Sequence, residues 1–272
     1  MQDLTRDWWT LLTAVAAFNL AAWAASAWWL RHRHARAGAA LLGFQRTQLL
    51  LSAVYVAGCA WRSALPVFDV PRLVLVDSWW SSVVVGRTVA TLAELAFAAQ
   101  WALLLQAASQ ATGSRGGRVL SRLLLPMIAV AELFSWYSVL TTANIGHVVE
   151  ETLWGCGALV LVAGLGFMWR GLGRVQRRLA LVLAAGGLVY AAYMFGVDVP
   201  MYWARWHADE AQGRVYLHLA QGLSDAGSRW VVSHRWSDWQ SEVVWMTLYF
   251  SVAVWVSIGL AHAPVHRERS RG

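Results

Sequence analysis

The densest group of residues able to do chemistry is His147-Val-Val-Glu150-Glu151. On a helix, residues three and four apart lie on one face, so the imidazole would adjoin both carboxylates. Imidazole and carboxylate groups bind divalent transition metals, and we expect His147 and Glu151 to be metal ligands. Crowded carboxylates in an apolar setting also serve as general acids and bases, which predicts a catalytic role for Glu150. A structural ion-pair network at a helix start is the alternative interpretation.

Further ionisable side chains lie inside or at the ends of long apolar stretches. A charge in hydrocarbon is costly, so such groups are expected to face the protein interior and to have partners there. Glu94 and Glu132 lie near the middle of two stretches, which favours catalytic carboxylates or a proton relay. Other charged groups, nearer the ends of such stretches or just outside them, are predicted to bind substrate, the arginines by holding an anionic group. These are Arg62, Arg87, Asp198 and Arg229.

Seven apolar stretches are each long enough to cross a bilayer as a helix of roughly 20 residues. The sequence therefore predicts an all-α polytopic membrane protein, a seven-helix bundle forming one domain over residues 1–272. Few helix-breaking residues interrupt these stretches, and no internal repeat is evident, which counts against many transporter folds. The predicted spans are Trp8–Leu30, Gln45–Leu65, Ser82–Ser109, Val119–Thr142, His147–Met168, Arg178–Val197 and Glu242–His262.

The charges between these stretches are sorted by sign. Every Lys or Arg position is an arginine, and 14 of the 22 fall in alternate gaps or at the adjoining ends of the stretches, with one acid, Glu268. Arginine-rich loops stay in the cytoplasm, so the N-terminus is expected outside and the C-terminus inside. Most acids then lie on the outer side, where a polar cavity is predicted. The inner arginines are Arg31, Arg33, Arg36, Arg46, Arg115, Arg118, Arg122, Arg170, Arg174, Arg177, Arg178, Arg267, Arg269 and Arg271.

The composition agrees with a membrane protein and excludes several other classes. The chain has 272 residues, is 58% hydrophobic and contains 19 tryptophans, many at the ends of the predicted spans, as in an interfacial aromatic belt. The net charge of +7 forms no continuous basic stripe, so nucleic acid is not an expected partner. The absence of lysine excludes a retinal Schiff base. We expect a bacterial-type inner or plasma membrane protein with the lipid bilayer as its partner.

Residues 199–241 form the largest predicted extracytoplasmic segment. Within it, polar residues recur at helical spacing between Arg214 and Arg229, opposite an apolar face that includes Leu219 and Leu223. This pattern predicts an amphipathic helix in the outer loop between the sixth and seventh spans. The helix would either lie on the membrane surface or cover the outer cavity as a lid.

Three classes of function remain open on this evidence. The first is a membrane-embedded enzyme that uses a divalent transition metal or acid/base chemistry on a lipid-like or amphiphilic substrate. The second is a proton-coupled transporter with Glu94 and Glu132 as the relay. The third is a ligand-binding sensor or assembly subunit without chemistry.

Overall fold

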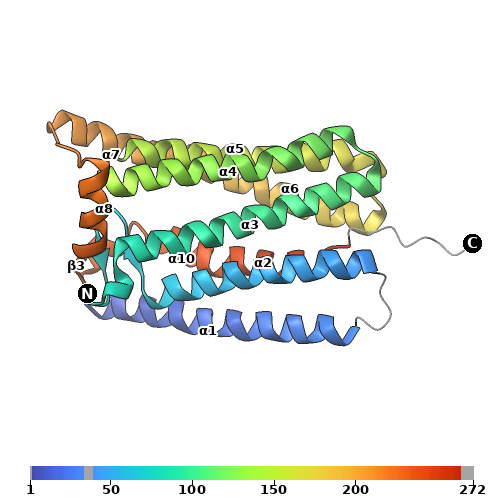
Figure 1. Ribbon diagram of the computed structural model, residues 1–272, viewed down its shortest axis with the longest axis horizontal. Helices are drawn as coiled ribbons and strands as arrows, with labels where there is room; N and C mark the ends of the chain where they lie inside the picture. The colour runs from blue at the N-terminus through green and yellow to red at the C-terminus, as the bar shows by residue number, and fades with distance from the viewer. Residues whose placement is uncertain (1, 34–38, 265–272) are drawn as a thin grey trace, which may run out of the picture. The chain divides into compact units, whose positions relative to one another are not determined.

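The computed structural model describes residues 2–33 and 39–264, and it is almost entirely helical (Figure 1). Its helices α1 to α11 and the short helical turns between them are joined by brief loops, apart from a small sheet of three two-residue strands. The all-α prediction is confirmed. The elements are α1 (Gln2–Arg33), α2 (Ala39–Ala64), β1 (Val67–Phe68), β2 (Leu73–Val74), η2 (Trp79–Ser81), α3 (Val83–Thr112), α4 (Arg115–Thr141), α5 (Ile145–Met168), η3 (Trp169–Gly171), α6 (Arg174–Tyr193), η4 (Met194–Asp198), α7 (Val199–Ala211), α8 (Leu219–Ser228), β3 (Val231–Val232), α9 (Trp236–Trp239), α10 (Val243–Leu248), η5 (Tyr249–Ala253) and α11 (Val254–Leu260).

Six helical segments of the described residues are long and apolar enough to cross a membrane, judged by length and composition. A helix satisfies its own backbone hydrogen bonds, which is the condition for crossing hydrocarbon. This composition is that of an integral membrane protein. The segments are Leu4–His32, Val83–Thr112, Arg115–Thr141, Ile145–Gly171, Arg174–Ala211 and Val243–Leu260.

The second predicted span, Gln45–Leu65, is not among the six. Its residues form the greater part of α2, a helix of 26 residues. Polar side chains such as Gln48 and the charged groups Arg46 and Arg62 lower its average apolarity, although Gln48 is fully buried. The helix itself is therefore present as predicted, while the count of seven spans stays a prediction.

The described chain divides into two compact units, which are considered separately. The first contains residues up to Phe97, the short stretch Val139–Thr142, and Leu217–Ala261. The second contains Ala98–Ser138, Ala143–Tyr216 and the residues from His262. The first unit thus combines the first third of the sequence with a late stretch, and most of the second comes from the middle.

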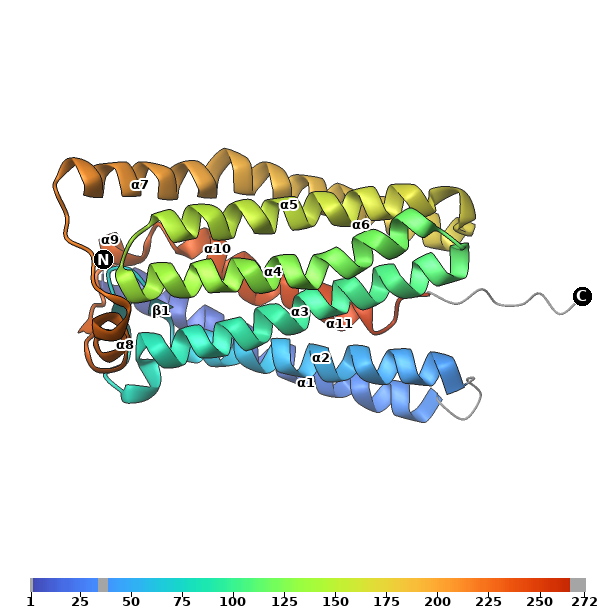
Figure 2. The ribbon, with the colours of Figure 1, turned by 45° about the horizontal axis from the view of Figure 1, so that its top comes forward.

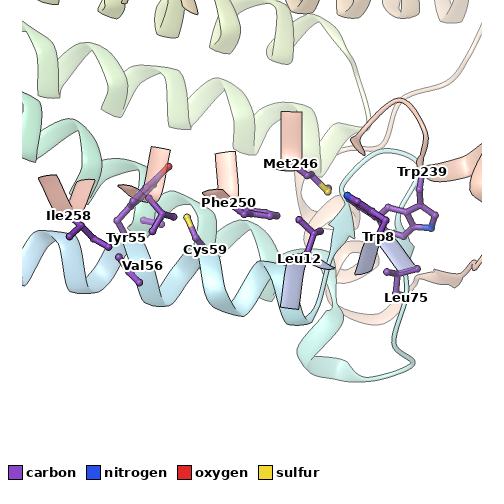
Figure 3. Close-up of a cluster of buried hydrophobic side chains, with 12 residues drawn as sticks. Trp8, Leu12, Tyr55, Val56, Cys59, Leu75, Trp239, Met246, Phe250 and Ile258 are labelled. Atoms are coloured by element: carbon purple, nitrogen blue, oxygen red, sulfur yellow. The ribbon is translucent and has the colours of Figure 1, made fainter. Parts of the chain in front are cut away.

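The first unit is held by a core between α1, α2 and the last helical elements. Aromatic and aliphatic side chains from Trp8, Tyr55, Trp239, Phe250 and their neighbours are buried there and lie in a row (Figure 3). Tryptophan hydrogen bonds tie the helices together, because a buried indole N–H needs an acceptor. Trp8 Nε1 donates to Thr247 Oγ1 at 3.0 Å, joining the first helix of the chain to α10.

One end of the first unit is closed by the small sheet and α8, which runs across the direction of α1 and α2 (Figure 1). β2 pairs antiparallel with β1 and parallel with β3. The predicted amphipathic helix over 214–229 is present only as the ten residues of α8. Gly213, with φ of +65°, follows the end of α7, residues 214–217 form no helix, and α8 begins after its N-cap, His218.

The helix α8 is fixed on the unit by a buried charge pair and a close contact. Arg72 Nε lies 2.5 Å from Asp225 Oδ2, and Arg229 also pairs with Asp225. The hydrogen bond from Arg229, together with Arg72, holds the pKa of the Asp225 carboxyl below its ordinary value. A Cβ on Gly222 would lie 2.0 Å from the Leu140 carbonyl oxygen, so only glycine fits there. These contacts fix α8 on the first unit, and its predicted role as a lid or as a membrane-surface helix stays a prediction.

In the second unit, α5 packs against α6, η4 and α7 (Figure 2). The predicted sixth span ends at Val197, but the helix continues from Arg174 to Ala211. Pro200 lacks an N–H and would clash with a carbonyl in a regular helix. Here the five residues of η4, a π-helical turn, precede it, and Val199 N–H donates to the Met194 carbonyl. This wider turn lets the helix pass the proline instead of ending at it.

Some residues named in the sequence analysis lie outside the described part of the chain. They are Arg36, Arg267, Glu268, Arg269 and Arg271.

Candidate functional site

Most of the candidate residues are buried, as the sequence predicts. Seven are less than a tenth exposed, while Glu151 is half-buried and Arg229 is exposed. Charged groups removed from water need partners, so the contacts of each decide what it can do. The buried seven are Arg62, Arg87, Glu94, Glu132, His147, Glu150 and Asp198.

In the second unit, His147 and Glu150 form a directly bonded pair. His147 lies in the first turn of α5, and Glu150 follows one turn later on the same face. His147 Nδ1 and Glu150 Oε2 are 2.7 Å apart, and both side chains are less than a tenth exposed. The i, i+3 relation predicted from the sequence is confirmed at the atomic level. The carboxylate accepts the Nδ1 proton, which leaves Nε2 as the second nitrogen for a proton or a ligand.

The start of α5 is held by contacts that the sequence analysis did not single out. Ser138 Oγ accepts a hydrogen bond from the His147 backbone N–H at 2.8 Å and donates to the Ala143 carbonyl at 2.5 Å. Gly146 lies so close that an added Cβ would be 2.5 Å from the Phe134 carbonyl oxygen. These contacts fix the backbone that carries the imidazole.

A tyrosine from a distant part of the sequence covers the imidazole. The rings of His147 and Tyr202 have centroids 4.8 Å apart and planes inclined by 35°. Tyr202 belongs to α7, and the Arg205 guanidinium lies 5.3 Å from the centre of its ring. Sequence reasoning missed Tyr202 because it assigned residues after Val197 to a loop. The helical continuation past Pro200 places this side chain.

Of the other predicted acids of the second unit, Glu132 approaches the pair, because one of its carboxylate oxygens lies within 4.8 Å of one from Glu150. Glu132 is buried in α4, Asp198 is buried at the end of η4, and Glu151 is half-buried beside Glu150 in sequence. Glu150 is the carboxylate that bonds His147. A metal site on this unit would use His147 Nε2, with Glu150 as the carboxylate that orients the ring.

The first unit contains a second buried group of polar residues, centred on Glu94 of α3. Arg87 Nη2 donates to Glu94 Oε2 at 2.5 Å, and the Tyr249 hydroxyl donates to Glu94 Oε1 at 3.0 Å. Arg87 also reaches Thr91 Oγ1 at 3.4 Å. Tyr249 comes from η5, a π-helical turn within the last apolar segment. Both carboxylate oxygens of Glu94 therefore have hydrogen-bond donors, and the charge of Arg87 balances that of Glu94.

Arg62 lies in the last turn of α2, in the same unit. Its Nη2 donates to the Val67 carbonyl at 3.3 Å, and its guanidinium carbon lies 6.0 Å from the centre of the Phe250 ring. Arg229, by contrast, is at the end of α8 and pairs with Asp225. Of the residues predicted to bind substrate, the three in the first unit, Arg62, Arg87 and Arg229, thus contact different groups.

Comparisons with protein-family models, with curated proteins and with solved structures find no match for this chain.

Proposed function

We propose that the protein is a membrane-embedded enzyme in which the His147–Glu150 pair performs acid/base chemistry on a lipid-like or amphiphilic substrate. The 2.7 Å contact between Nδ1 and Oε2 is the observation that supports this proposal. A carboxylate bonded to one ring nitrogen fixes the tautomer and strengthens the other nitrogen as a base. The surrounding helices are apolar enough to lie in a bilayer, so a substrate reaching this pair would be lipid-like.

The proposed roles differ from the sequence prediction, in which Glu150 is catalytic and His147 is a metal ligand. His147 exchanges the proton through Nε2, and Glu150 positions the ring and stabilises its protonated form. Proton transfer by a placed side chain contributes about 10² to 10⁴ in rate. Glu132 remains a candidate catalytic carboxylate, because one of its oxygens lies within 4.8 Å of one from Glu150. Glu94 remains a candidate catalytic carboxylate and Asp198 a candidate substrate-binding residue, as the sequence predicts.

A divalent transition metal on His147 Nε2, with Glu151 as a further ligand, is the metal-assisted form of the same proposal. Histidine ligands of metals usually give their other nitrogen to a carboxylate, which is how Glu150 is placed. Proton-coupled transport through Glu94 receives less support. Its carboxylate already holds Arg87 at 2.5 Å, and protonation of Glu94 would break that ion pair.

For the whole chain, we propose one domain with seven spans, the N-terminus outside and the C-terminus in the cytoplasm. The arginines in alternate loops support this orientation. The segment 199–241 would then lie at the outer side of a bacterial-type plasma membrane, with α7 continuing its helix and α8 fixed on the first unit.

The test of the enzymatic proposal is turnover of membrane lipids by the purified full-length protein in liposomes made from the total lipid of the producing cells. Products are followed by mass spectrometry. We expect His147→Ala to lower the rate by about 10² to 10⁴ and Glu150→Gln to lower it as well. Glu210→Gln is the control, because Glu210 is an exposed acid of the same unit whose carboxylate accepts a hydrogen bond from the Tyr216 hydroxyl.

Metal analysis of the same samples separates the two forms of the proposal. A stoichiometric metal that His147→Ala and Glu151→Ala both remove would support the metal-assisted form. In that case Glu151→Ala would lose activity as well. Undiminished turnover by a folded His147→Ala protein would rule out both forms.

A further inference from the structure

Among the described residues of the first unit, three arginines are buried, and they differ in their partners. Arg62, Arg72 and Arg87 are 4%, 1% and 4% exposed. Arg72 and Arg87 each have a carboxylate oxygen 2.5 Å away. Arg62 has no carboxylate partner among the described residues, and its Nε has no hydrogen-bond partner there. Of these three buried charges, that of Arg62 is therefore the one with no paired carboxylate among the described residues.

The contacts that Arg62 does make cannot replace an anion. The bond to the Val67 carbonyl is 3.3 Å long, whereas a charge-assisted bond is about 2.8 Å. The Phe250 ring at 6.0 Å lies at the outer limit of a cation–π contact. The negative end of the α2 dipole is favourable, but it contributes less than the burial of a guanidinium costs.

The position of Arg62 indicates the depth at which a counter-ion would be found. It lies in the last turn of α2, after which the chain leaves the helix for β1. The preceding residue, Trp61, packs edge-on against Trp80, and Trp79 and Trp80 are more than half exposed. Exposed tryptophans at helix ends lie at the level of lipid headgroups. Phosphate groups of lipids are found at the same level.

We propose that Arg62 is the binding site for an oxyanion, a phosphate group carried by a phospholipid headgroup or by free phosphate. The planar guanidinium presents Nε and a terminal nitrogen side by side, which matches two oxygens of a phosphate. The phosphate replaces the long contact to Val67 and supplies a partner for Nε. This site lies in the first unit and is independent of the His147–Glu150 pair, so either proposal can fail without the other.

The test measures thermal unfolding of the purified full-length protein in a neutral detergent, followed by its tryptophan fluorescence. The probes are inorganic phosphate, and mixed micelles containing phosphatidylglycerol or an uncharged glycolipid. A ligand that binds the folded state raises the unfolding temperature with concentration. We expect stabilisation by at least one phosphate-containing probe and none by the uncharged lipid. A response to inorganic phosphate identifies a free anion, and a response to phosphatidylglycerol alone identifies a headgroup.

The variants Arg62→Gln and Arg46→Gln assign the effect to the site. Arg46 is an exposed arginine of the same helix, so its variant makes the same charge change without touching the site. We expect Arg62→Gln to weaken binding about tenfold or more and Arg46→Gln to behave as wild type. Equal binding by Arg62→Gln and wild type would overturn the proposal. Absence of any phosphate effect on the wild-type protein would overturn it even if Arg62→Gln failed to fold.

Discussion

Glu94 shows how a single carboxylate is accommodated within a helical segment apolar enough to span a membrane. One oxygen holds the Arg87 guanidinium and the other accepts the Tyr249 hydroxyl. Removing one partner of such a buried pair leaves the other charge unpaired, which costs more than removing both. The unfolding free energies of single and double variants therefore distinguish a coupled pair from two independent residues.

We expect Arg87→Gln and Glu94→Gln each to lower the free energy of unfolding by about 3 kcal/mol, because each leaves a buried charge without its counter-ion. The double variant Arg87→Met/Glu94→Met should lose clearly less than the sum of the two. Denaturant unfolding in detergent, followed by tryptophan fluorescence, measures all three. Thr91→Ala, which removes the long 3.4 Å contact, is the control and should cost less than about 1 kcal/mol. Strictly additive losses would contradict a coupled pair.

At the same scale, the contact predicted from sequence is one between residues close in the chain. His147 and Glu150 are three residues apart on one helix, and helical geometry alone predicts their contact. Tyr249 lies 155 residues from Glu94, and Ser138 lies nine residues before His147 across the turn between two helices. No spacing rule reveals such pairs, because the packing of separate elements creates them.

Among the elements, α7 and α8 show where sequence patterns stop being informative. The predicted sixth span ends at Val197, whereas the helix continues past Pro200 because a π-helical turn accommodates the proline. The polar stripe from Arg214 correctly indicated amphipathicity, but the helix begins only at Leu219. Gly213 ends the preceding helix by adopting a positive φ. The periodicity of the neighbouring residues does not predict this backbone conformation.

The contact of Gly222 with Leu140 predicts how firmly α8 is fixed. Gly222→Ala would place a Cβ 2.0 Å from the Leu140 carbonyl oxygen, so α8 has to move away from it. We expect a loss of more than about 2 kcal/mol in unfolding free energy and easier proteolysis of residues 217–233.

Gly227→Ala is the matched control on the same helix. Its Cβ would meet only Val84 Cγ1, at an ordinary 3.6 Å. The higher helix propensity of alanine should then leave stability unchanged or raise it by up to about 1 kcal/mol. Equal behaviour of the two alanine variants would show that α8 is not fixed by this contact.

For the molecule as a whole, the number of spans depends on whether α2 crosses the membrane. Six segments are apolar enough by themselves, and α2 is more polar but buries Tyr55, Val56 and Cys59 in the core of the first unit. Helices shielded by neighbours tolerate more polar residues than lipid-facing ones. Average hydropathy cannot separate these cases, because it does not distinguish lipid-facing from protein-facing positions.

Two single-cysteine variants decide the number of spans. Arg31→Cys precedes α2 and Pro71→Cys follows it, and both positions are exposed. With Cys59 and Cys156 replaced by alanine, a membrane-impermeant maleimide applied to intact cells should label Pro71→Cys but not Arg31→Cys. Lysed cells, in which both should react, provide the control. Labelling of both or neither in intact cells would place the two ends of α2 on one side and contradict seven spans.

The first unit also has a consequence for biosynthesis. Asn19, buried in α1, donates to the Phe250 carbonyl 231 residues later, and Trp8 reaches Thr247. A ribosome delivers the first helices long before the last, and domains assemble as their parts emerge. The polar groups of α1 therefore wait for these partners while most of the second unit is translated. We therefore expect α1 to need insertion machinery that shelters its polar side chains until the last helices are made.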